Sequence, residues 1–167
     1  MTLAWALVEE GRATWLRGNH EQRLIDTLDS KTIEKRSELL HNDTYQQLGE
    51  ALTLKWIARL KKLPFCYQRE GWTATHAGFN SLGAPDLRVR ETFWENYDGR
   101  FGRVIVGHTP RPEIERHQHI VMIDTGACYG GFLTAYCPET DAVVQVLGEE
   151  QQPMHVNLKK THKPLLC

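Results

Sequence analysis

The side chains with the clearest metal and proton chemistry lie in three short segments of the sequence. These segments are Gly18-Asn19-His20-Glu21, His76-Ala77-Gly78 and Gly107-His108-Thr109-Pro110. Each directly follows a run that we predict to be a β-strand, namely Ala13–Arg17, Trp72–Thr75 and Arg103–Val106. Because ligands gather at the carboxyl ends of strands in open α/β sheets, we expect the three segments to meet at one place. An amide oxygen and imidazole nitrogens suit a transition metal better than magnesium or calcium, so the pattern predicts a metal site.

These segments also carry a family resemblance. Together with Arg17, they resemble the last three metal-binding blocks of the calcineurin-like metallophosphoesterases, and most closely those of the bacterial serine/threonine protein phosphatase and diadenosine tetraphosphatase branch. The runs Tyr97–Arg103 and Ile123–Ala135 resemble the same branch. The resemblance extends over roughly residues 3 to 147 in the order of the family, whereas a lone Gly-Asn-His-Glu would be a weak signal.

The resemblance implies a fold, an activity and site residues. The fold is an α/β four-layer α/β/β/α sandwich. The activity is the hydrolysis of phosphomonoesters or dinucleoside polyphosphates by metal-activated water, with a phosphorylated protein or a dinucleoside polyphosphate as substrate. Asn19, His76 and His108 correspond to ligands of one metal, and His20 to the catalytic residue that protonates the leaving oxygen. Manganese is the first choice of metal, with iron and zinc as alternatives. No substrate-binding residue can be assigned.

The sequence departs from the family at its N-terminal side. The family's Gly-Asp-x-His-Gly and Gly-Asp-x-Val-Asp-Arg-Gly blocks occur nowhere in the chain. We therefore expect an N-terminally incomplete domain that lacks the first metal site and has impaired activity. An amide and two neutral imidazoles bring no negative charge, so metal binding should be weak. The alternative is a non-catalytic, truncated remnant that acts as a binding or structural module.

Several side chains have simpler interpretations. A histidine at a strand end can cap the strand through a backbone hydrogen bond. Glu21 is expected to cap helix amides, and Asp124 to anchor the backbone or support the ligands. Three arginines near the last segment could grip phosphate, but none is assigned as a site residue: Arg100, Arg103 and Arg111.

Composition narrows the remaining classes. The chain has 167 residues, 41% apolar and 25% charged, which is ordinary for one globular domain. A net charge of −1 gives no electrostatic case for nucleic acid or an anionic membrane. Four scattered cysteines and no export signal favour a cytoplasmic protein. We predict a phosphoesterase domain at 1–148, a polar tail at 149–167, and self-association through an exposed sheet edge.

Hydrophobic periodicity predicts the elements that position the site. The expected helices are Thr2–Glu10, about Glu21–Leu28, most of Ile33–Leu63, and about Leu87–Asn96. Within the third, an apolar stripe should face the core at Leu48, Leu52, Trp56 and Leu60. Further strands are expected at Phe65–Gln68, His119–Ile123, Phe132–Tyr136 and Ala142–Leu147, the last two as a hairpin. The four strands after residue 102 would form the second sheet of the family fold.

Overall fold

The computed structural model describes residues 1–149, except for the side chains at positions 35 and 36. Beyond Glu149, the predicted tail lies outside the described residues. The helices are α1 (Thr2–Glu9), α2 (Asn19–Asp29), α3 (Ile33–Ser37), the 3-10 helix η1 (Glu38–His41), α4 (Asp43–Leu60), α5 (Glu91–Asn96) and the 3-10 helix η2 (Ala127–Tyr129). None of the helices within this range is long and apolar enough to cross a membrane.

A mixed five-stranded sheet organises the chain, in the order β1-β2-β5-β7-β6. Its strands are β1 (Cys66–Arg69), β2 (Trp72–Thr75), β5 (Arg103–Val106), β6 (Glu115–His117) and β7 (Ile120–Met122). The three central strands β2, β5 and β7 run parallel, and the two edge strands pair antiparallel. Two small hairpins, β3 (Gly78–Phe79) with β4 (Pro85–Asp86) and β8 (Phe132–Cys137) with β9 (Ala142–Leu147), complete the fold. The carboxyl ends of the parallel strands therefore share one edge, as the motif pattern predicted.

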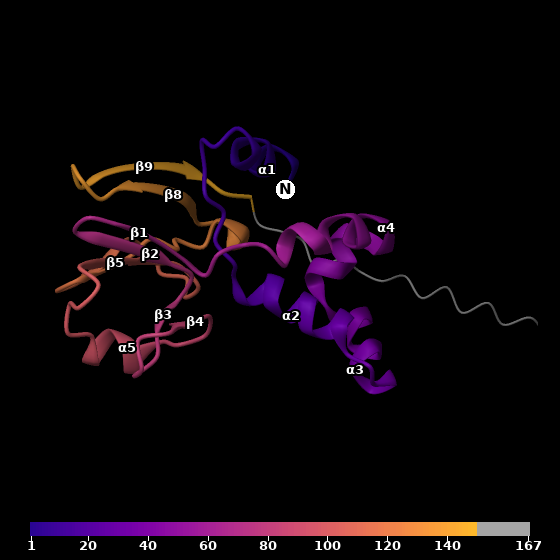
Figure 1. Ribbon diagram of the computed structural model, residues 1–167. Coiled ribbons are helices and arrows are strands. Elements are labelled where there is room, and N and C mark those ends of the chain that lie inside the picture. The colour runs from indigo at the N-terminus through magenta and orange to yellow at the C-terminus, as the bar shows by residue number, and fades with distance from the viewer. Residues whose placement is uncertain (150–167) are drawn as a thin grey trace, which may run out of the picture.

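The central strands β5 and β7 are apolar over nearly their whole length. Val104, Ile105 and Val106 of β5 are all at most 6% exposed, and all of β7 is buried. Such continuous apolar runs are typical of parallel strands that are covered on both faces. In Figure 1, α5 and β3 cover one face of the sheet and the β8–β9 hairpin crosses the other.

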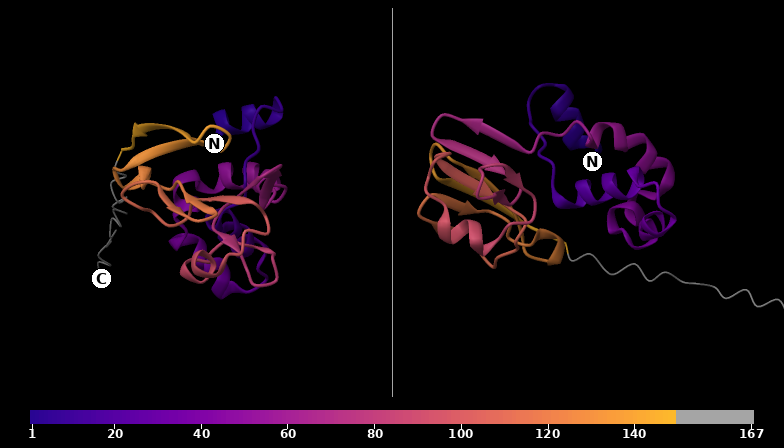
Figure 2. Two further views of the ribbon diagram at one scale, coloured as in Figure 1. Left: turned by 90° about the vertical axis from the view of Figure 1, so that its left-hand side faces the viewer. Right: turned by 60° about the horizontal axis from the view of Figure 1, so that its bottom comes forward.

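The chain forms two separate apolar cores. One core lies between the sheet and α5, around Phe79, Phe93 and Val106. The other lies among the helices, around Leu24, Trp56 and Leu60. Figure 2 shows the helices α2 to α4 beside the sheet rather than stacked on it. The chain therefore consists of a helical lobe and a sheet lobe, joined by the segment between α4 and β1.

Sequence patterns located most of the elements but misjudged several contacts. The segment Ala13–Arg17 is extended but belongs to no strand, and its one backbone bond toward the sheet lobe runs from the Arg17 N–H to the Pro64 carbonyl (2.8 Å). The strands β5 and β7 join β1 and β2 in one sheet, so the prediction that the four strands after residue 102 form a sheet of their own was wrong. The edge strand β6 was missed. The predicted α/β class is confirmed, whereas the four-layer sandwich is not.

The predicted stripe along α4 holds only in its C-terminal half. Trp56 is 6% exposed and Leu60 fully buried, but Leu52 is 47% exposed. Gly49 breaks the helix with φ 71° and ψ 171°, which rotates the residues on either side relative to one another. Glycine populates this region readily because it has no Cβ.

The outward face of the β8–β9 hairpin is apolar and open. Thr134 and Tyr136 face the sheet lobe, where they bond to Thr125 and Arg103. Strand alternation then turns Leu133, Val144 and Val146 outward, and these side chains are 57 to 67% exposed. Among the described residues β9 pairs only with β8, so its outer edge is unpaired.

We expect the chain to self-associate through this edge, because β9 carries no charge or proline to block strand addition. Val144→Lys should shift the chain toward monomer in size-exclusion chromatography with light scattering. Lys55→Ala, an exposed change on α4, is the control and should have no effect. A wild-type chain that runs as a sharp monomer peak at tens of micromolar would contradict the prediction.

Candidate metal and phosphate site

Three side chains predicted as metal ligands meet at one point. The Nε2 atom of His76 lies 2.7 Å from Oδ1 of Asn19 and 3.2 Å from Nδ1 of His108. The Nδ1 atom of His108 lies 3.2 Å from the same Asn19 oxygen. The structure thus brings together an amide oxygen and two ring nitrogens from segments that are up to 89 residues apart. We call these three residues the Asn–His–His trio.

Both lobes contribute to the trio. His76 follows β2 and His108 lies two residues after β5, at the shared carboxyl edge of the parallel strands. Asn19 comes from the helical lobe, as the first residue of α2. The trio therefore lies where the helical lobe meets the edge of the sheet.

His108 is held in a backbone conformation that is rare for its residue type. Its φ is 70°, and the N–H of Thr109 donates to the carbonyl of Gly107 across it (2.8 Å). This closes a three-residue γ-turn of the uncommon form with positive φ, which is strained for a residue with a Cβ. Such strain costs about 1 to 3 kcal/mol and gathers at functional sites. The turn directs the ring of His108 back toward His76 instead of continuing the strand.

Burial keeps the imidazoles neutral. Desolvation, followed by the nearby His108 and His20 rings, lowers the pKa of His76 from 6.5 to about 4. Desolvation also lowers the pKa of His108, with Arg90 as the next cause. Neutral imidazoles with free lone pairs are the form that binds metal.

The lowered pKa of His76 predicts a pH dependence of stability. Below pH 6.5 the unfolded chain takes up a proton at this residue that the folded chain binds only near pH 4. Stability from this group is therefore fully present above pH 6.5 and is lost as the pH falls toward 4. Replacing His76 by glutamine should remove about 1 to 2 kcal/mol of this loss, a value reduced because the half-buried ring is partly solvated. Chemical denaturation of the wild type and of His76→Gln from pH 7 to 4 measures the free energy of unfolding of each. If the two free energies fall in parallel as the pH is lowered, the prediction is wrong.

Gly18 and Glu21 fix the approach of α2 to the site. The Gly18 N–H donates to Oε2 of Glu21 (2.8 Å), which confirms the predicted capping role of that carboxylate. A Cβ on Gly18 would lie 2.8 Å from the same oxygen and 3.0 Å from Cε1 of His76. A glycine is therefore needed here for close packing rather than for its backbone angles.

His20 lies beside the trio but is exposed to solvent. Its charge is one of the causes that lower the pKa of both His76 and His108, which places it close to both rings. Within residues 1–149, no hydrogen bond orients its imidazole. The ring can reach a molecule bound at the trio, but its direction is not fixed.

The arginines near the trio differ from those suggested by the sequence. Arg100 pairs with Asp98 (2.8 Å), and Arg103 donates to the Tyr136 hydroxyl (2.8 Å). Arg111 lies over the ring of Trp94, 4.8 Å from its centroid. All three are engaged elsewhere.

Arg88 and Arg90, in the segment before α5, contribute to the electrostatics of His108. Both are exposed, and both help to lower the pKa of His108, so their positive charges lie near it. Neither forms an ion pair within the described part of the chain. No local motif marks them, and only the fold reveals that the segment before α5 passes the trio.

A cavity of about 390 Å³ adjoins the two imidazoles and extends between the sheet and the start of β8. Asp124 lines it, raises the pKa of His108 through its negative charge, and accepts the Gly126 N–H at Oδ1 (3.1 Å). The predicted backbone-anchoring role of Asp124 is therefore confirmed. The cavity falls in the size range of small-ligand sites.

The donor set suits a transition metal, although it is sparse. Three lone-pair atoms converge, two of them on neutral imidazoles. In residues 1–149 no group of three or more His, Cys, Asp or Glu side chains could hold a metal, and the third donor of the trio is an amide. The site therefore offers nitrogen and oxygen ligands without a carboxylate, which fits weak binding of manganese, iron or zinc.

Comparison with known proteins agrees with this architecture. The chain matches no family model, and no curated protein matches it in sequence. Its structure is similar to a crystal structure of a proposed diadenosine tetraphosphatase, with a TM-score of 0.62 and 16% sequence identity. The match covers 90% of this chain and 75% of that one. At this identity, the similarity establishes a shared fold.

Proposed function

We propose that the chain is a metal-dependent phosphoesterase of the serine/threonine protein phosphatase type. The observation that carries the proposal is the convergence of the Asn19, His76 and His108 donor atoms within 2.7 to 3.2 Å. The fold shared with a proposed diadenosine tetraphosphatase supports the same class. Dinucleoside polyphosphates, or phosphomonoesters such as phosphorylated proteins, are the substrates that this class would take.

The trio would hold a divalent metal, with manganese as the first choice and iron or zinc as alternatives. A bound divalent metal supplies Lewis acidity toward a phosphate oxygen and activates water for attack. Because the trio contributes no negative charge, we expect weak metal binding and impaired turnover in this chain.

The protein side chains would position the phosphate and the leaving group. Arg90 and Arg88 place positive charge beside His108, where a phosphate could accept bidentate hydrogen bonds. His20 would donate a proton to the leaving oxygen as a general acid. Its exposed and unanchored ring is a second reason to expect slow turnover.

A binding or structural module without catalysis is the second candidate. The observation that favours it is the open apolar face of β8–β9, where Leu133, Val144 and Val146 are more than half exposed. Large exposed apolar faces are typical of surfaces that contact another protein.

Hydrolysis of two phosphomonoesters separates the candidates. We expect slow, manganese-dependent hydrolysis of p-nitrophenyl phosphate and of phenyl phosphate, measured across a manganese titration. His20→Ala should slow the phenyl ester about 100-fold or more, because its poor leaving group needs the proton. The effect on the nitrophenyl ester should be smaller, since its leaving group departs as the anion.

His41→Ala is the control, because His41 lies in η1 of the helical lobe and is exposed. Equal activity of this variant and the wild type would exclude a general effect of losing a histidine. If manganese binds but neither ester is hydrolysed, the phosphoesterase proposal is wrong and the binding module is favoured.

A further inference from the structure

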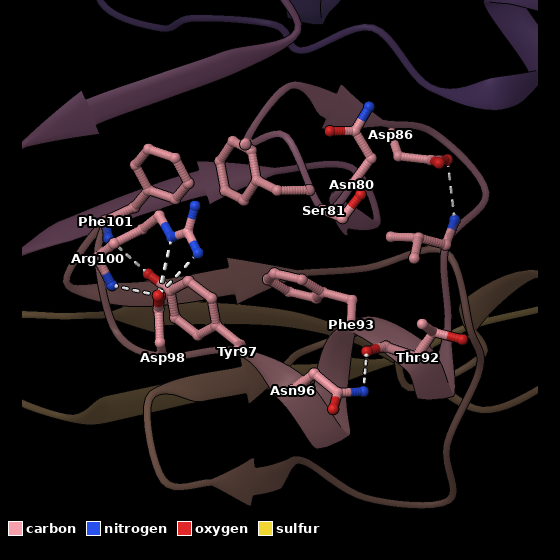
Figure 3. A pocket seen from close by; sticks show the side chains of 13 residues that line it. Asn80, Ser81, Asp86, Thr92, Phe93, Asn96, Tyr97, Asp98, Arg100 and Phe101 are labelled. Atoms are coloured by element: carbon pink, nitrogen blue, oxygen red, sulfur yellow. Dashed lines mark hydrogen bonds and ion pairs between the residues drawn. The ribbon is translucent and has the colours of Figure 1, made fainter.

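A second cavity, of about 450 Å³, lies on the face of the sheet opposite the β8–β9 hairpin. It is enclosed by the β3–β4 hairpin, α5 and the loop after α5 (Figure 3). Four aromatic rings line it, and each lies next to two others. The centroid distances are 6.0 Å for Phe79–Phe93, 5.0 Å for Phe93–Tyr97, 6.5 Å for Tyr97–Phe101 and 4.3 Å for Phe79–Phe101. Such a lining favours a flat aromatic ligand.

The rim of this cavity offers both a hydrogen-bond donor and an acceptor. The Oδ1 atom of Asn80 accepts the N–H groups of Leu82 and Ala84 (both 3.0 Å), which leaves its amino group available. Asn96 donates its amino group to the Thr92 carbonyl (2.8 Å), which leaves its Oδ1 available. In Figure 3 the two amides lie on opposite sides of Phe93. A nucleobase combines flat faces with an edge that carries donors and acceptors, and asparagine is a common partner for adenine.

The cavity is also close to the candidate metal site. Phe79 follows His76 by three residues, so their Cα atoms are at most about 11 Å apart. Val89 lines the cavity, and its two neighbours in the chain, Arg88 and Arg90, are exposed arginines at the same rim. A ligand with a flat ring at one end and a phosphate at the other could therefore contact the aromatic rings and the arginines together.

We propose that this cavity binds the base of a nucleotide whose phosphate end lies toward Arg88 and Arg90. The choice of a nucleotide over another flat aromatic molecule rests on the proposed phosphoesterase function. Binding of the base itself needs neither metal nor hydrolysis. The cavity would then make the site prefer nucleotide phosphates over phosphates without a ring system.

The test compares two ligands that share a phosphate but differ in the base. Isothermal titration calorimetry of the metal-free full chain with adenosine 5′-monophosphate and with ribose 5-phosphate should show at least about tenfold tighter binding of the nucleotide, from base stacking. Thr92→Trp fills the cavity from α5 and should remove this preference. Glu95→Trp adds the same ring to α5 outside the cavity lining and should retain it.

Equal affinity of the wild type for the two ligands would overturn the proposal, as would a preserved preference in Thr92→Trp. If that variant does not fold, as judged by circular dichroism, Ser81→Trp fills the cavity from the β3–β4 side and must give the same loss. The hydrolytic function is assessed separately with p-nitrophenyl phosphate, which carries no base. If the chain prefers the nucleotide but hydrolyses no ester, the cavity proposal holds and the phosphoesterase proposal is rejected. If it hydrolyses the ester but shows no preference for the nucleotide, the phosphoesterase proposal holds and the cavity proposal is rejected.

Discussion

His76→Ala is expected to abolish manganese binding at pH 7, with a loss of affinity of at least about 100-fold. The His76 nitrogen lies 2.7 Å from the Asn19 oxygen and 3.2 Å from the His108 nitrogen, so it is one of three donors in a compact triangle. Loss of a supporting residue around a metal typically costs 10- to 100-fold, and loss of a ligand should cost more. Electron paramagnetic resonance of free manganese measures the affinity directly.

Two further variants sharpen this result. His41→Ala removes an exposed histidine of η1 and should leave binding unchanged. Asn19→Asp adds the negative charge that the trio lacks and should tighten binding by about tenfold. If His76→Ala binds manganese as well as the wild type does, the trio is not the metal site. If Asn19→Asp binds no more tightly, the charge explanation for weak binding is wrong.

Gly18→Ala is expected to disrupt the site although it adds only a methyl group. The new Cβ would lie 3.0 and 3.1 Å from two ring atoms of His76, and 2.8 Å from Oε2 of Glu21. Glu21 can move away only by giving up its bond to the Gly18 N–H, which caps α2. We expect a loss of about 1 to 3 kcal/mol in stability and about tenfold in manganese affinity.

Gly107→Ala is the matched control, because Gly107 lies in the same site. A Cβ there would meet its nearest neighbours, the His76 carbonyl oxygen and Asp124 Cβ, at 3.7 and 3.8 Å, which are ordinary contacts. Thermal unfolding and manganese titration of both variants compare the two positions. Equal effects at Gly18 and Gly107 would show that the close approach of Gly18 to His76 is unimportant.

The sequence was most informative where a motif followed a strand. The positions of β2, β5 and β9 were predicted to the residue, and His76 and His108 meet at strand ends as expected, whereas Asn19 joins them from the start of α2. The apolar runs of β5 and β9 are local signals, and the parallel arrangement of β2 and β5 then brings His76 and His108 together.

Contacts between distant segments were less predictable. The predicted apolar stripe along α4 is wrong at Leu52, because Gly49 interrupts the helix and changes its direction. A single glycine in a helical pattern is not enough to predict such a break. Ala13–Arg17 has the composition of a strand, but strand pairing needs a neighbour, and within residues 1–149 its only backbone bond toward the sheet lobe runs to Pro64. Arg88 and Arg90 carry no motif at all. Their importance depends on a loop path that only the three-dimensional structure gives.

The division of the trio between the two lobes has a consequence for folding cooperativity. Each lobe has its own core, and Asn19 is the donor that the helical lobe contributes to a site otherwise formed by the sheet lobe. Each core could open as a separate unit, and opening of the helical one would remove Asn19 from the trio. A metal that binds only the joined state would raise the free energy of opening by an amount set by its concentration relative to its Kd. Hydrogen exchange in α2 and α4 would then slow with added manganese, although Asn19 is the only residue of these two helices that is proposed to bind the ion.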